Sequence, residues 1–165
     1  MFENRPFPKT YLFKLHADHR EVEIPEGFSI RSFHPGKTFH DKVWQLLSAF
    51  SSHRFTRWEM LNEKGEVVTY EHTIGKIFQF PFLGRKDIHF GPSFTPPEFR
   101  RKGYHKKLLN YIINQLPGRT IYAWVHYDNT PSINTLERLG FQRVGLIRFT
   151  RYTRRYVVTE WFDEA

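Results

Sequence analysis

Cysteine is absent from the 165-residue sequence. This absence excludes disulfide bonds, thiolate metal ligands and a cysteine nucleophile together. No apolar stretch approaches the roughly 20 residues that span a bilayer. Residues 1–13 also lack the apolar segment and the small-residue cleavage site of a signal peptide. These absences favour a cytoplasmic protein that has no membrane-bound part.

Several sequence motifs of enzymes and metal sites are missing as well. The chain has no Gly-x-Ser-x-Gly nucleophile elbow and no Gly-Lys-Ser/Thr phosphate loop. His16 and His19 lie close together in the sequence, but no third ligand follows at a useful spacing. We therefore expect no metal site.

Aromatic residues and positive charge are abundant. Aromatic residues make up 18% of the chain and hydrophobic residues 39%, which predicts one globular domain over residues 1–165. The net charge is +8, and residues 97–155 hold twelve Lys and Arg against three acids, which gives +9 and leaves −1 for the rest. Such a field attracts anions, whether nucleic acid, phosphorylated cofactors or acidic substrates.

The spacing of apolar residues predicts strands mixed with helices. Helical spacing predicts helices at residues 36–50, 105–116 and 130–140, the first of them capped by Thr38. Strands are predicted at residues 10–17, 27–35, 67–80, 87–95, 120–127, 141–150 and 154–162. Residues 53–69 are ambiguous apart from a turn. We therefore expect an α+β fold with a single mixed, mostly antiparallel, twisted sheet of about seven strands flanked by helices.

A basic run, RRKGYHKK, occupies residues 100–107 between a predicted strand and a predicted helix. Such a junction directs several backbone N–H groups at one point, where the helix dipole also favours negative charge. Gly103 permits positive φ or close approach of a ligand. Arg100, Arg101 and Lys102 add attraction for phosphate. The run predicts a phosphate or pyrophosphate cradle, with a solvated basic helix face as the alternative.

A nucleic-acid interface is the rival interpretation of this run. The letters KGY match the start of an RNA-binding RNP1 motif, but HKKLL lacks the small and aromatic residues that should follow. The helical spacing after Gly103 also contradicts the strand on which that motif lies. Binding of nucleic acid is therefore not expected.

Two segments together resemble the GCN5-related N-acetyltransferase (GNAT) superfamily. The segment PPEFRRKGYHKKLL resembles the family's acetyl-coenzyme A loop, with Arg100 and Gly103 at matching positions. Further on, NTPSINTLERLGF resembles its Asn-x-x-Ala/Ser…Gly-Phe signature. The resemblance covers residues 87–158, where we place the coenzyme-binding motifs. It implies a GNAT-like fold and an acyl-CoA-dependent N-acyltransferase.

The resemblance also implies how acetyl-CoA, as cosubstrate, would bind. Its pyrophosphate would contact the backbone N–H groups of residues 101–105. Its pantetheine arm would pair with the strand near Phe94 and Thr95. The residues implied in coenzyme binding are Phe94, Thr95, Arg100, Arg101, Lys102, Gly103, Tyr104, His105, Asn129 and Ser132.

The sequence departs from the family at two positions. His105 replaces the last small residue of the loop, and we expect its side chain to point outward because the first helical turn has little room inward. Leu136 stands where many relatives carry the tyrosine that protonates the departing thiolate. Tyr127 is the expected replacement, with Tyr104 as the next candidate. Without a replacement acid, either the thiolate leaves unassisted, or the chain binds coenzyme A as a sensor or scaffold without catalysis.

Acetylation of an amine also needs a base within hydrogen-bond reach. The candidates on the central strands are Glu71, His72, Asp87 and His89. We choose His89, since its strand leads into the coenzyme site and histidine titrates near neutral pH. The alternative is a histidine that only fills one face of the sheet. A backbone N–H near Phe94 would stabilise the oxyanion.

The expected acceptor is a small molecule with a primary amine. The arrangement FPFLGRKDI…FTPPEFRRKGY resembles family members encoded with bacterial surface-polysaccharide enzymes, which suggests an amino sugar or a nucleotide-linked amino sugar. The positive field suits a diphosphate and disfavours a cationic polyamine. Peptide N-termini and lysines stay open as acceptors, and the protein is expected to be a monomer or a homodimer.

Overall fold

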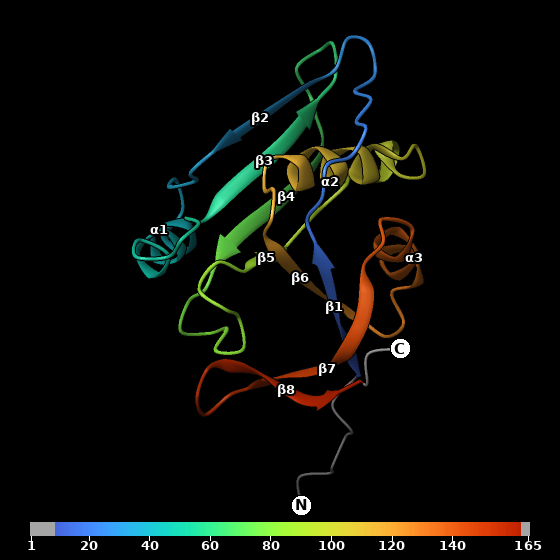
Figure 1. Ribbon diagram of the computed structural model, residues 1–165. Helices are drawn as coiled ribbons and strands as arrows, with labels where there is room; N and C mark the ends of the chain where they lie inside the picture. The colour runs from blue at the N-terminus through green and yellow to red at the C-terminus, as the bar shows by residue number, and fades with distance from the viewer. Residues whose placement is uncertain (1–8, 163–165) are drawn as a thin grey trace, which may run out of the picture.

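The structure, a computed structural model, describes residues 9–162 and shows one mixed sheet with helices on both faces (Figure 1). Residues 1–8, the larger part of the segment that lacks signal-peptide features, lie outside this range. The strands are β1 Thr10–His16, β2 Ser29–Phe33, β3 Thr56–Leu61, β4 Val67–Gly75, β5 Ile88–Phe90, β6 Thr120–His126, β7 Gln142–Thr150 and β8 Arg155–Trp161. The helices are α1 Phe39–Leu47, α2 Tyr104–Asn114 and α3 Thr130–Arg138, with a short 3₁₀ helix at Pro97–Phe99.

The sheet has eight strands in the order β2-β3-β4-β5-β6-β1-β7-β8. The β5–β6 pair is parallel and the other pairs are antiparallel. This confirms the α+β class and the mixed, mostly antiparallel sheet, with β3 as the additional strand in the ambiguous region. The first strand, β1, lies between β6 and β7, so the β7–β8 hairpin forms one edge of the sheet (Figure 1).

The strands predicted at residues 67–80 and 87–95 are shorter in the structure. Strand β4 ends at Gly75, and β5 covers three residues. Residues 76–86 form a loop whose apolar side chains Ile77, Phe80 and Leu83 are buried, so burial without strand pairing explains the wrong boundary. This loop lies next to the β7–β8 hairpin, where the Tyr156 N–H donates to the Gln79 carbonyl at 2.8 Å.

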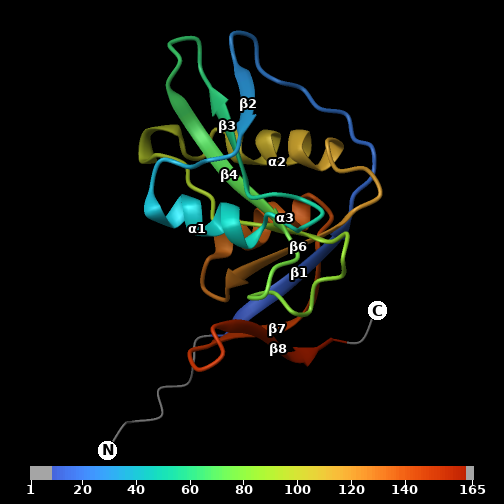
Figure 2. The same cartoon turned by 90° about the vertical axis from the view of Figure 1, so that its left-hand side faces the viewer.

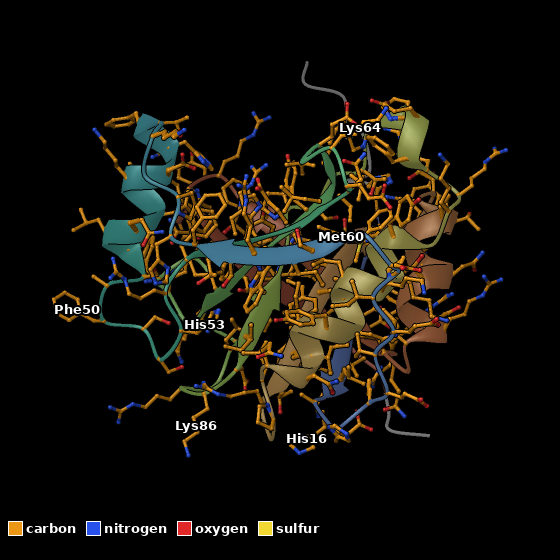
Figure 3. The ribbon with its side chains drawn as sticks, turned by 90° about the horizontal axis from the view of Figure 1, so that it is seen from above. His16, Phe50, His53, Met60, Lys64 and Lys86 are labelled. Carbon is orange, nitrogen blue, oxygen red and sulfur yellow. The ribbon has the colours of Figure 1, made fainter. Side chains whose placement is uncertain are left out.

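Helix α1 begins at the predicted cap. The Asp41 N–H donates to Thr38 Oγ1, and the Thr38 N–H donates to the Asp41 carboxylate, both at 3.0 Å, which forms a capping box. Its Trp44 packs against the sheet, whereas Leu46 is 73% exposed. Phe50, beyond the end of the helix, points away from the molecule (Figure 3). The predicted helix is confirmed, but Leu46 and Phe50, which helical spacing also places among its apolar residues, are exposed.

The sheet separates two clusters of buried side chains. Helices α2 and α3 cover one face, and Leu109, Ile112 and Leu136 belong to its cluster. Helix α1 and the loop of residues 76–86 cover the other face, where Phe80 belongs to the second cluster. Figure 2 shows α1 in front of the sheet and α2 behind it. Within residues 9–162, no helix is long and apolar enough to cross a membrane.

Candidate functional site

The sheet opens where β5 and β6 diverge. The two strands pair from Ile88 to Phe90, opposite Ile121 to Ala123. The chain then leaves β6 at Gly91, and Phe94 bridges to Tyr70 of β4 instead. Strand β6 continues to its end without this neighbour, so a gap opens between two adjacent strands.

A cavity of about 930 Å³ occupies this divergence, which is the size of a small-molecule site. Its first end, here called the helix end, is lined by Glu71, Ser93, His105, Leu109, Ser132 and Leu136. Its second end, here called the aromatic end, is lined by Trp44, Gln79, Phe80, His89, Trp124 and Tyr156. The apolar members of the two ends belong to clusters on opposite faces of the sheet. The cavity therefore connects the two faces between the strands.

The loop before α2 has the geometry of an anion site. The backbone N–H groups of residues 101–105 donate to no acceptor among the described residues. Gly103 has a φ of 77°, and a Cβ placed there would meet nothing within 4 Å. Arg101 also has positive φ, at 62°, and Arg100, Arg101 and Lys102 are exposed. Unpaired N–H groups at a helix N-terminus, surrounded by cations, fit a phosphate or pyrophosphate.

His105 points into the cavity, so the outward orientation expected from the sequence is wrong. Its Nε2 lies 3.1 Å from Glu71 Oε2, and the Glu71 side chain is 4% exposed. The other carboxylate oxygen, Oε1, accepts the His72 N–H at 3.0 Å. A buried carboxylate needs hydrogen-bond donors, and His105 supplies one. Reasoning from α2 alone missed this partner because it comes from β4.

His89 lies in the aromatic end and is 5% exposed. Its ring stacks on Trp124, with centroids 3.5 Å apart and planes at 15°. Its Nδ1 is buried and has no hydrogen-bond partner among the described residues. The backbone at Gly91 lies close to the ring, since a Cβ added there would be 3.7 Å from Nε2. Burial lowers the pKa of His89 well below its ordinary value, so the ring is neutral at neutral pH.

Of the other candidate bases, only Glu71 lines the cavity in the described part of the chain. The His72 Nδ1 pairs with the Pro92 carbonyl at 2.8 Å, and its ring stacks on Phe55. The Asp87 carboxylate accepts the Gly84 N–H at 2.6 Å and so supports a loop. His72 and Asp87 therefore have structural partners away from the cavity.

The tyrosines are placed differently from the sequence expectation. Tyr127 is 52% exposed and Tyr104 packs on Phe28 at 5.0 Å, and neither lines the cavity. Tyr156 of β8 lines the aromatic end, with its ring 4.6 Å from Trp124. Burial raises the pKa of Tyr156, so its hydroxyl stays protonated. No local signal marked Tyr156, since its position depends on the pairing of β7 with β8 and on the loop that they contact.

The other residues implied in coenzyme binding lie around the helix end. Asn129 and Ser132 line the cavity, and Asn129 Oδ1 accepts the Ser132 N–H at 3.3 Å as the cap of α3. The backbone N–H and C=O of Phe94 are already paired with Tyr70. The N–H groups of Ser93 and Thr95, on either side of Phe94, donate to no backbone acceptor among the described residues.

Sequence reasoning missed most of the aromatic end. The sequence did not single out Trp44, Phe80 and Trp124, which form one wall of the cavity. Arg151 and Arg154, in the turn between β7 and β8, also line it. Within residues 9–162, no three His, Asp or Glu side chains are placed to hold a metal ion together.

The splayed mixed sheet and the unpaired N–H groups before α2 define the class of fold, and sequence comparison gives the family. Residues 30–141 match the model of the acetyltransferase (GNAT) family. The match covers more than half of the chain, and the chain belongs to this family. The resemblance found in the two segments is thereby confirmed.

Solved structures of GNAT proteins share the fold. A GCN5-related N-acetyltransferase from Sphaerobacter thermophilus has a TM-score of 0.58 and 15% identity, over 84% of this chain and 49% of its own. A tandem GNAT protein from the clavulanic acid biosynthesis pathway has a TM-score of 0.57 and 16% identity, over 84% of this chain and 51% of its own. A GNAT-family acetyltransferase from Colwellia psychrerythraea has a TM-score of 0.55 and 11% identity, over 82% of this chain and 53% of its own.

The chain spans only part of the solved structures that it matches, at 48%, 49% and 51% of three of them. Comparison of the sequence with curated proteins gives no match. The likenesses show the fold, and the acceptor has to be argued from the cavity.

Proposed function

We propose that the protein is an N-acetyltransferase that transfers an acetyl group from acetyl-CoA to a primary amine. The observation that carries this proposal is the cavity at the β5–β6 divergence. It lies beside unpaired N–H groups on the α2 side, and it has a neutral histidine and a protonated tyrosine on the other side. We further propose that residues 1–165 form a single cytoplasmic domain, as a monomer or a homodimer.

The residues around the helix end fit the coenzyme. The N–H groups of residues 101–105 would bind its pyrophosphate, with Arg101 and Lys102 adding positive charge. The free N–H group of Thr95 would pair with the pantetheine arm, which Asn129 and Ser132 would also contact. Arg100 supports this strand, since its Nε donates to the Thr95 carbonyl at 2.9 Å.

Tyr104 and the Phe94 backbone have structural roles in this scheme. Tyr104 anchors the start of α2 on Phe28, and Phe94 holds its segment to β4. His105 fixes the buried Glu71 carboxylate beside the expected path of the pantetheine arm. We propose that this hydrogen-bonded pair shapes the helix end, because the relatives' small residue is replaced here by a side chain that points inward.

Acetyl-CoA supplies a thioester when it is bound. In the net reaction the amine nitrogen gains a bond to the acetyl carbon, that carbon loses its bond to sulfur, and one proton moves from nitrogen to sulfur. His89, neutral at neutral pH, would take the proton of the amine directly or through a water. Tyr156 would donate a proton to the sulfur, and the Ser93 N–H would stabilise negative charge on the acetyl oxygen.

The expected acceptor is a small amine, with an amino sugar or a nucleotide-linked amino sugar as our first choice. The aromatic side chains of the cavity offer an apolar surface for a sugar ring, and the basic side chains nearby suit a phosphate. Peptide N-termini and lysines stay open.

A second candidate is a GNAT-fold protein that binds coenzyme A without catalysis. Leu136, buried in the cavity wall where many relatives carry a tyrosine, favours it. Tyr156 argues against it because it offers another proton donor. A basic nucleic-acid-binding domain is less favoured; retention on DNA or RNA that falls steeply with salt would support it.

The test has two steps. Acetyl-CoA is first titrated into the protein by calorimetry, and failure to bind would overturn the proposal. Release of free thiol from acetyl-CoA is then followed with Ellman's reagent in the presence of amines. The chain has no cysteine, so the protein gives no background in this assay. We expect amine-dependent thiol release, and binding without any release would favour the second candidate.

A further inference from the structure

The aromatic end has two enclosed polar atoms that no described residue satisfies. They are Nδ1 of His89 and Oε1 of Gln79, and both residues line the cavity. Buried polar atoms in folded proteins nearly always have a partner, so two unpaired atoms in cavity-lining residues mark this end as a place where polar groups are not yet satisfied.

The wall around these atoms is made of flat rings. Trp124 stacks on His89 and lies 4.6 Å from Tyr156, measured between ring centroids. Phe80 lies 5.0 Å from Trp124 and 6.1 Å from Trp44. Because His89 and Tyr156 both pack on Trp124, these side chains form a rigid apolar wall against which a ligand ring can pack.

The charges around the aromatic end are positive. Arg151 and Arg154, both exposed, line the cavity from the β7–β8 turn. Among the cavity-lining residues of the described chain, the only carboxylate is Glu71 at the helix end, and both of its oxygens are occupied by His72 and His105. A second ammonium group would find no counter-charge here, whereas an anionic group would find two guanidinium groups.

We infer that the aromatic end selects a primary amine that carries a ring and an anionic group, which Arg151 and Arg154 bind. The inference rests on the proposed acetyltransferase function and names the substrate class for it. The ring lies on the aromatic wall, the amine is presented to His89, and the carboxylate or phosphate lies in the β7–β8 turn. A neutral analogue of the same ring binds and reacts more weakly.

Two matched pairs of amines test this selectivity. Glucosamine 6-phosphate is compared with glucosamine, and 4-(2-aminoethyl)benzoate with phenethylamine. Each pair differs by one anionic group on the same ring. Each amine is titrated calorimetrically with and without acetyl-CoA, and its kcat/KM is measured by thiol release. For at least one pair, the anionic member is expected to bind and react about ten- to hundredfold better, as expected for a charge-assisted contact.

The double substitution Arg151→Glu with Arg154→Glu should abolish this preference. Arg85→Glu with Lys86→Glu is the matched control, because it makes the same total charge change at two exposed residues outside the cavity and should keep the preference. Equal binding of both members of each pair to the wild type, or a preference that survives the double substitution, overturns the inference. Acetylation without any preference overturns only this inference, whereas absence of acetyl-CoA binding overturns the proposed function.

Discussion

Substitution of Gly103 by valine tests whether the loop before α2 binds the pyrophosphate of acetyl-CoA. A control variant distinguishes a loss of affinity from a loss of stability. Gly103 has a φ of 77°, in the left-handed region, which costs a residue with a side chain about 1–2 kcal/mol and a β-branched one more. Space is not the constraint, since a Cβ there would meet nothing within 4 Å. Valine therefore changes the loop backbone or extends into the open space where the pyrophosphate is expected.

The expected loss of binding follows from the N–H groups of the loop. A hydrogen bond from an N–H to a charged group contributes about 1.5–3 kcal/mol. Loss of one such bond raises the Kd for acetyl-CoA by about ten- to hundredfold. The assay is calorimetric titration of acetyl-CoA into wild type and Gly103→Val.

Gly118→Val is the matched control for this substitution. Gly118 has a φ of 69°, and a Cβ there would also meet nothing within 4 Å. It lies after α2, at the end opposite the anion site. Both variants should lose a similar free energy of unfolding in urea, but only Gly103→Val should lose affinity. Equal affinity of Gly103→Val and wild type would refute a pyrophosphate site in this loop.

Three further predictions concern Tyr156, the pair of His105 and Glu71, and the half-buried His53, which lies outside the cavity. Tyr156→Phe should lower kcat about a hundredfold with an unchanged Kd for acetyl-CoA. Tyr127→Phe, at a residue outside the cavity, should change neither quantity. Equal effects of the two substitutions on kcat would reject Tyr156 as the acid. His105→Ala leaves the buried Glu71 carboxylate short of a hydrogen-bond donor, and it should lower the free energy of unfolding in urea by about 1–3 kcal/mol. His105→Gln should lower it by less. An Ala variant as stable as wild type would contradict the role of this pair. Burial lowers the pKa of His53 to about 4, so between pH 6.5 and 4 the unfolded chain binds more protons. The free energy of unfolding should therefore fall as the pH drops through this window, and it should fall less in His53→Gln. An equal dependence of the free energy of unfolding on pH in both proteins would contradict the lowered pKa of His53.

The sequence predicted the parts of the fold that depend on local patterns. The face of α2 formed by Leu108, Leu109, Ile112 and Ile113 is buried as its spacing indicated. The cap of α1 at Thr38 follows from its side-chain chemistry. The loop around Gly103 was recognisable because glycine and basic residues stand between a strand and a helix.

Long-range pairing could not be predicted from local patterns. Nothing in residues 10–17 indicates that β1 inserts between β6 and β7. That insertion sets the place of the β7–β8 hairpin and so brings Tyr156 to the cavity. The inward orientation of His105 likewise depends on Glu71, which is 34 residues away in the sequence. The candidate acid and the arginines of the β7–β8 turn therefore became visible only in the structure.

Acetyl transfer itself is the most direct test of the function proposed here. Purified protein is mixed with acetyl-CoA and with glucosamine 6-phosphate or 4-(2-aminoethyl)benzoate, and free thiol and acetylated amine are measured together, by Ellman's reagent and by mass spectrometry. We expect equal amounts of both products for at least one amine, and a loss of about a hundredfold or more in His89→Gln with unchanged acetyl-CoA affinity. Tight binding of acetyl-CoA without product from any amine would contradict catalysis, and product formation that is unaffected in His89→Gln would contradict the role of His89.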